Sequence, residues 1–256
     1  MASIVVFDSG FGSLSIIKAI QKKTKSDIIY FADQKSFPYG TKSIADLKKI
    51  IKTTITNIKK QFKPDLIVMG SNTPSILLQE IVKYDQIVIG VLPPLTDAQR
   101  ITNTKSVAIL ATKSVIKNKK LDQYIKENIT RNIKITKINI SELVDLVESG
   151  KFIYAQNFCR KKINSILKKK FLGNNVDVAT LSSTHLPFLS LMLSEIFPRI
   201  TFLDPAEQIA EQIIKHKNFS PSARNSLKVF SSGDVLRFQR QLKHIGIKNK
   251  VNKINF

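Results

Sequence analysis

Short apolar runs alternate with longer amphipathic stretches along the whole chain. Unbroken apolar runs such as Ile4–Phe7 and Leu66–Val68 predict buried strands, whereas apolar residues spaced three or four positions apart over Ile44–Phe62 predict a helix. The remaining predicted strands are Asp27–Phe31, Gln86–Val91, Ser106–Leu110, Ile133–Ile138 and Asp177–Leu181, and further predicted helices are Asn157–Lys170 and Ala206–Lys215. This alternation is typical of α/β proteins with parallel sheets.

Two of the predicted strands end in a similar polar pattern. The stretch Val68–Ser75 passes from the strand through a small residue to Ser71 and Thr73, and Leu181–Phe188 passes to Ser183 and Thr184 in the same way. Ligands of parallel α/β sheets bind at the carboxyl ends of strands. We therefore expect the two strand ends, one in each half of the chain, to face each other across one crevice.

A glycine-rich turn, Asp8–Ser15, follows the first strand. Its glycines permit a tight turn and a close approach of a ligand to the backbone, and we expect Ser13 or Ser15 to cap the next helix. A strand, a polar turn and a helix start can together bind an anion. Many α/β proteins begin in this way, so the turn alone does not identify a function.

The tandem prolines Pro93–Pro94 mark the expected crossover between two halves, and Thr201–Ala206 marks the return. We predict one α/β domain from residues 1–94 plus 205–256, and a second from residues 95–204. The basic tail, Ile245–Phe256, is expected to be loosely ordered.

Composition narrows the class of protein. The chain has 256 residues, of which 43% are hydrophobic, but no apolar run long enough to cross a bilayer, and its start lacks the basic segment of a signal peptide. We therefore predict a cytoplasmic protein.

The single cysteine, Cys159, excludes a disulfide within the chain, and we expect it to be buried in a helix. The three histidines lie far apart in sequence, so no zinc site is expected.

The formal net charge is +22. Such a charge attracts nucleic acid and other polyanions. It also results when lysine occupies most solvated helix positions, and the lysines here are spread widely with few aromatic residues among them. Both interpretations stay open.

Several motifs, in order, resemble those of glutamate racemase. Asp8–Ser15 resembles Asp-Ser-Gly-x-Gly-Gly-Leu-Ser, with Ser13 in place of a glycine, and residues 38–40 resemble Pro-Tyr-Gly. Ser71–Thr73 resembles Cys-Asn-Thr, and residues 182–187 resemble Gly-Cys-Thr-His-Tyr-Pro. Leu143–Gly150 resembles Leu-Val-Glu-x-Gly, and residues 232–234 resemble a closing Ser-Gly-Asp turn. The family's acidic residue after the fourth strand is missing, because Pro93 stands there.

The resemblance implies two pseudo-symmetric α/β domains with the site in the cleft between them, and no metal, pyridoxal phosphate or nucleotide. It implies that an acidic amino acid such as glutamate is the ligand, and it leaves open whether the chain forms a homodimer. The substrate-holding positions that it implies are Asp8, Ser9, Tyr39, Gly40, Asn72, Thr73, Thr184 and His185. The two catalytic cysteines of the family correspond to Ser71 and Ser183, with Asp8, Glu148 and His185 as helpers.

Racemisation without a cofactor requires an acid/base group on each face of the α-carbon. A thiol suits this task because its pKa, about 8.5, can be lowered by its neighbours, whereas a serine hydroxyl is far too weak an acid unless a base adjoins it. We therefore expect racemisation to be impaired or lost. The alternatives are a non-catalytic binding or regulatory protein, with a weak contact to a polyanion, or a hydrolase or lyase that uses Ser183 and His185.

Overall fold

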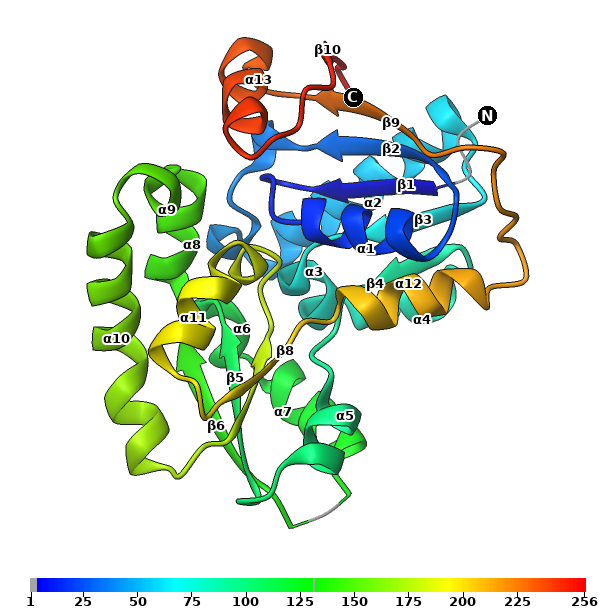
Figure 1. The fold of residues 1–256 in the computed structure, drawn as a ribbon. Helices are drawn as coiled ribbons and strands as arrows, with labels where there is room; N and C mark the ends of the chain where they lie inside the picture. Colours follow the sequence, from blue (N-terminus) through cyan, green and yellow to red (C-terminus); the bar gives the residue numbers. More distant parts are fainter. Residues whose placement is uncertain (1–3, 131) are drawn as a thin grey trace. The chain divides into compact units, whose positions relative to one another are not determined.

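The computed structural model describes residues 4–130 and 132–256, which form two compact units. The first unit comprises Met1–Val91 and Ala206–Phe256, and the second comprises Leu92–Pro205. Each unit contains one parallel sheet with helices between its strands (Figure 1). The predicted class, α/β with parallel sheets, is confirmed.

The sheet of the first unit has the strand order β10-β9-β2-β1-β3-β4, and all of its pairings are parallel. Its strands are β1 (Ile4–Asp8), β2 (Asp27–Ala32), β3 (Leu66–Met69), β4 (Val88–Gly90), β9 (Ser226–Ser231) and β10 (Val251–Lys253). Every residue of β1 is buried, so helices and loops cover both faces of the sheet at its centre.

The helices of this unit are α1 (Leu14–Lys23), α2 (Ile44–Phe62), α3 (Asn72–Leu77), α4 (Gln79–Tyr84), α12 (Ala206–Ile214) and α13 (Val235–His244). Helix α2 shows how the sequence sets such an element. The Ser43 hydroxyl accepts a hydrogen bond from the Asp46 amide (3.1 Å) and caps its start. Leucine and isoleucine at helical spacing are buried along one face.

Two local expectations hold only in part. Ser13 is the N-cap residue of α1, but its hydroxyl makes no capping hydrogen bond, and the Ser15 hydroxyl donates to the Gly12 carbonyl instead (3.3 Å). The tail is not loosely ordered throughout, because Val251–Lys253 forms the edge strand β10 beside β9. The Gln239 side chain of α13 holds this strand by accepting a hydrogen bond from the Val251 amide (2.7 Å).

The second unit has the strand order β6-β5-β7-β8, again entirely parallel. Its strands are β5 (Ser106–Ala111), β6 (Lys134–Asn139), β7 (Val178–Leu181) and β8 (Thr201–Leu203). Its helices are α5 (Leu95–Ile101), α6 (Lys113–Ile116), α7 (Lys119–Asn128), α8 (Ser141–Glu148), α9 (Lys151–Tyr154), α10 (Gln156–Gly173) and α11 (Ser190–Ile196). Cys159 is buried in α10, as predicted. None of the helices in the described ranges has the length and apolar character of a membrane span.

Candidate functional site

In the first unit, the polar residues that follow three strands meet at one edge of the sheet. Strand β1 lies between β2 and β3, with Asp8 opposite Ala32 and Phe7 opposite Met69. The Asp33 amide, just after β2, donates to the Asp8 carbonyl (2.7 Å). The parallel register therefore places Asp8, Asp33 and the residues after Met69 at the same carboxyl edge, where α/β sheets bind ligands.

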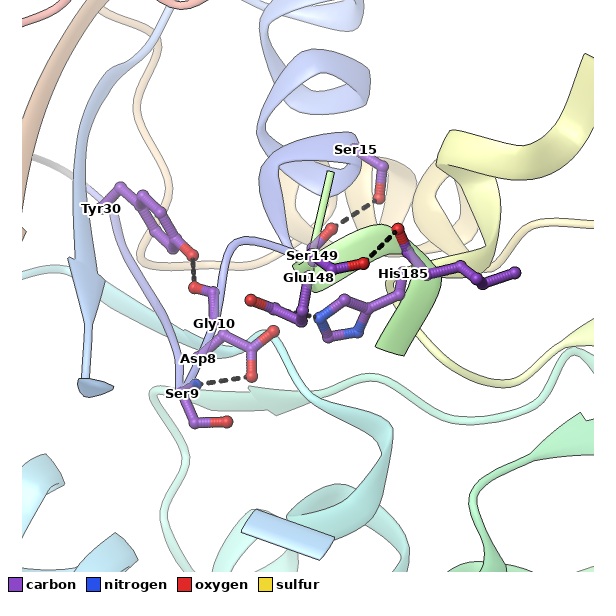
Figure 2. Close-up of polar contacts among 10 residues, drawn as sticks. Asp8, Ser9, Gly10, Ser15, Tyr30, Glu148, Ser149 and His185 are labelled. Carbon is purple, nitrogen blue, oxygen red and sulfur yellow. Dashed lines mark hydrogen bonds and ion pairs between the residues drawn. The ribbon is translucent and has the colours of Figure 1, made fainter. Parts of the chain in front are cut away.

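The turn after β1 is closed by polar contacts within this unit. The Asp8 carboxylate accepts a hydrogen bond from the Ser9 amide (2.6 Å), and the Tyr30 hydroxyl donates to the Gly10 carbonyl (Figure 2). Asp8 and Ser9 are buried. A carboxylate in this position can attract the ammonium group of an amino acid.

The loop after β3 carries Ser71, Asn72 and Thr73. Ser71 precedes α3, and its hydroxyl makes no capping hydrogen bond, while Asn72 and Thr73 are buried. The Asn72 side-chain amide donates to the Val91 carbonyl (3.0 Å), but its Oδ1 atom has no hydrogen-bond partner within residues 4–130 and 132–256. A buried acceptor without a partner is costly, so this oxygen is available to a ligand that donates a hydrogen bond.

Ser75, which was not among the predicted site residues, holds this loop by hydrogen bonds to the backbone. Its fully buried hydroxyl accepts a hydrogen bond from the Val91 amide (2.9 Å) and lies 2.7 Å from the Ser71 carbonyl oxygen. The residue that follows strand β4 is thereby linked through Ser75 to the backbone of Ser71. A serine in the first turn of a helix predicts no such contact, because its partner, Val91, comes from a distant segment that follows β4.

Tyr39 belongs to a buried hydrogen-bond network with Asp33 and Ser232. Of these three residues, the sequence predicted only Tyr39 as a site residue. Its hydroxyl donates to the Asp33 carboxylate (3.1 Å), and the Ser232 hydroxyl donates to the other oxygen of Asp33 (3.2 Å). Burial, together with the negative charges of Asp33 and Asp8, holds the pKa of Tyr39 well above its ordinary value. Tyr39 therefore stays a neutral donor, and Gly40 beside it is half-buried.

Asp33 and Ser232 were absent from the predicted site. Ser232 lies in the Ser-Gly-Asp turn after β9, and β9 pairs with β2, so that Ser231 lies opposite Ala32. The available signals were the polar residue after the predicted strand Asp27–Phe31 and the resembled Ser-Gly-Asp turn. The strand order that brings them together could not be predicted from the sequence.

In the second unit, Ser183, Thr184 and His185 follow β7, and all three are buried. His185 Nε2 lies 2.5 Å from Glu148 Oε1, at the end of α8 (Figure 2). The structure thus brings together Glu148 and His185, the two residues predicted as helpers in this unit. The hydrolase or lyase alternative needs His185 as a base beside Ser183, whereas His185 Nε2 contacts Glu148.

Comparison with known proteins gives a consistent answer, although no family model matches the chain. The chain is 32% identical over 213 residues to a glutamate racemase of Chlorobium phaeobacteroides, which covers 81% of this chain and 76% of the relative. It is 29% identical over 242 residues to a glutamate racemase of Thermoanaerobacter pseudethanolicus, covering 92% and 89%.

Solved structures agree on the fold. A glutamate racemase isoform from Bacillus anthracis matches with a TM-score of 0.88 at 22% identity, over 100% of this chain and 98% of the other. The Escherichia coli glutamate racemase, solved with L-glutamate and the activator UDP-MurNAc-Ala, matches with a TM-score of 0.83 at 23% identity, over 99% and 98%.

Proposed function

Because this chain belongs to the glutamate racemase family, we propose that it binds glutamate or a similar acidic amino acid but has impaired or lost racemase activity. The proposal rests on the hydroxyls of Ser71 and Ser183, which stand where the resemblance of the two motifs places the family's catalytic thiols. The remaining site residues keep the polar character that ligand binding needs.

The residues for binding support the first half of the proposal. Asp8 offers a carboxylate to the ligand's ammonium group, and Asn72 Oδ1 offers an acceptor that is otherwise without a partner among the described residues. Tyr39 remains protonated and can donate. Ser9, Gly40, Thr73, Thr184 and His185 complete the proposed set of substrate-binding positions.

The chemistry of the two hydroxyls supports the second half. A catalytic base works best when its pKa lies near the operating pH, and a serine hydroxyl meets this condition only with an adjacent base. The Ser71 hydroxyl makes no capping hydrogen bond at the start of α3, and His185 Nε2 is directed to Glu148. We therefore propose that Ser71 and Ser183 occupy the proton-transfer positions without transferring protons at a useful rate.

The test is α-proton exchange, measured by proton NMR of L-glutamate and L-aspartate incubated with the protein in D₂O. The matched variant is the double substitution Ser71→Cys/Ser183→Cys, which restores both thiols at nearly unchanged volume. Since a positioned acid or base contributes about 10²- to 10⁴-fold, we expect exchange by the double variant to exceed that of the natural chain by at least about 10²-fold.

Binding is measured separately, by ligand-observed NMR of the same amino acids. Saturable binding of one of them, without exchange by the natural chain, is the expected result. Rapid exchange by the natural chain would refute the proposed loss of activity. Absence of binding to both the natural chain and the double variant would refute the proposed ligand.

A second candidate function is contact with a polyanion, and one segment favours it. Residues 235–256 contain no Asp or Glu. Basic side chains are exposed along α13 and the loop that follows it, namely Arg237, Arg240, Lys243, Lys248 and Lys250. If all five contact phosphates, the logarithm of DNA affinity should fall with the logarithm of salt concentration with a slope of about −4.5.

Retention on a DNA column across a salt series tests this candidate. Arg240→Gln/Lys243→Gln should reduce the salt slope by about 2, since each removed contact lowers it by about 1. The control, Lys161→Gln/Lys170→Gln, removes the same charge from exposed positions of α10 in the other unit. An equal reduction by both variants would show that only the overall charge matters.

A further inference from the structure

A surface cavity of about 510 Å³ lies in the second unit, at the amino end of strand β7. Asp177, which directly precedes β7, lines it, as does Thr104, which precedes β5. Ser183 follows the opposite end of β7. At about 3.3 Å per residue, the distance along the strand from Asp177 to Ser183 is about 20 Å. The cavity is therefore separate from the candidate site of this unit.

The cavity has an apolar lining of the kind that small-molecule sites use. Phe171 and Val176 form its buried part, and the Phe171 ring packs edge-on against Phe197, with their centroids 5.0 Å apart. Leu172, on the rim, is 73% exposed. The volume falls within the range of about 300–1,000 Å³ that is typical of ligand pockets. An apolar group placed here would cover Leu172 and remove it from water.

Helix α10 carries two clusters of basic residues, 160–162 and 168–170, and their charge is neutralised unevenly. Towards its amino end, Arg160 pairs with Glu195 (2.5 Å) and Lys162 pairs with Glu142. At the cavity, Lys168 of α10 and Arg199 of the loop before β8 form no ion pair with any described residue. A second cavity of about 500 Å³ shares the lining residues Asn164, Lys168 and Leu172 with the first.

Asp177 is the acidic residue in the lining, and its carboxylate is already engaged. It accepts hydrogen bonds from the Thr102 hydroxyl (2.6 Å), the Asn103 amide (2.7 Å) and the Thr104 amide (3.0 Å). These contacts hold the carboxylate against the loop of residues 102–104. Lys168 and Arg199 are thus left as cations that can pair with a ligand.

We propose that this cavity binds a small amphipathic anion. The apolar body of the ligand packs against Phe171 and Leu172, and its carboxylate or phosphate pairs with Lys168 and Arg199. Charge complementarity selects an anion, and the apolar lining selects a ligand with an apolar body over inorganic phosphate or a free acidic amino acid. The proposal is independent of the proposed function, because no residue of the candidate site takes part.

The experiment measures the affinity of three probes for the full chain by saturation-transfer NMR. The probes are 2-naphthoate, 2-naphthyl phosphate and the neutral 2-naphthamide, which share one apolar body. At least one of the two anions should bind about tenfold more tightly than the amide, as expected for one charge-assisted contact. The anion that binds more tightly identifies the carboxylate or the phosphate as the preferred group.

Matched variants locate the site. Lys168→Glu should weaken binding of the preferred anion by about tenfold or more, whereas Lys161→Glu, an exposed lysine of the same helix outside the cavity, should leave it unchanged. Both changes affect solvent-exposed side chains, and circular dichroism checks that both variants fold.

Three outcomes would overturn the proposal. Equal weakening by Lys168→Glu and Lys161→Glu would assign the binding to the general positive charge. Displacement of the probe by L-glutamate would place it in the candidate site. Equal affinity of the amide and both anions would show that the cavity has no subsite for an anionic group. No saturable binding of any probe would show that the cavity does not bind such ligands.

Discussion

A single methyl group at Gly70 should destabilise the first unit, because Ser13 already occupies the space. A Cβ atom at Gly70 would lie 2.5 Å from Ser13 Cβ and 3.1 Å from the Phe7 carbonyl oxygen. Ordinary contacts between carbon atoms are about 3.5–4.0 Å. Ser13 is fully buried, and rotation of its side chain does not move its Cβ, so the start of α1 or the end of β3 has to shift.

The expected cost follows from this geometry. Overpacking a closely packed site costs about 1–3 kcal/mol, and a carbon–carbon overlap of about 1 Å against rigid backbone places Gly70→Ala towards the upper end. The measurement is urea unfolding of both forms, followed by far-ultraviolet circular dichroism. The transition of the first unit is fitted separately if the two units unfold apart.

Ser13→Gly supplies the control, since glycine is the residue at this position in the resembled motif. Replacing an N-cap serine by glycine costs only a few tenths of a kcal/mol, and the Ser13 hydroxyl has no partner among the described residues. In the double variant Ser13→Gly/Gly70→Ala, the nearest remaining obstacle is the Phe7 carbonyl oxygen. We expect a favourable coupling of about 1–2 kcal/mol between the two changes. Strict additivity, or a cost of Gly70→Ala below about 0.5 kcal/mol, would refute the argument.

Three further predictions concern stability and ionisation. Ser75→Ala should cost about 1–3 kcal/mol in urea unfolding because it leaves the buried Val91 amide without its partner, whereas Ser165→Ala on the exposed face of α10 should cost almost nothing. Burial alone would raise the pKa of Asp177, but hydrogen bonds from the 102–104 loop outweigh it and lower the pKa below its ordinary 3.8. The folded state therefore favours the carboxylate, so the stability that Asp177 contributes is present above about pH 4 and disappears at lower pH. The difference in unfolding free energy between the natural chain and Asp177→Asn should shrink from about pH 5 to pH 3, and a constant difference would contradict this. Burial, with a nearby glutamate, raises the pKa of Tyr124 to about 12. In a pH titration of phenolate absorbance, the difference between the natural chain and Tyr124→Phe should therefore have its midpoint near pH 12 rather than near pH 10.

Local residue patterns predicted the class of fold and the positions of most elements. Apolar runs such as Ile4–Phe7 and Leu66–Val68 are strands, and Ile44–Phe62 is a helix with the predicted limits. These features are local, because periodicity and capping depend on residues a few positions apart. The sequence also indicated the residues after the strands as the chemically important ones, and the motifs there pointed to the family that the relatives confirm.

Which of these residues come into contact within each unit depends on the tertiary structure and not on local patterns. Asp33 and Ser232 share a hydrogen bond although nearly two hundred positions separate them, because β9 returns to pair with β2. Ser13 fills the space beside Gly70, and Ser75 reaches the Val91 amide, through the order β2-β1-β3-β4. Val251–Lys253 is too short and too polar to predict as a strand, and it becomes one because β9 offers it an edge. Strand order follows from how whole faces pack together, and periodicity along the chain carries no information about it.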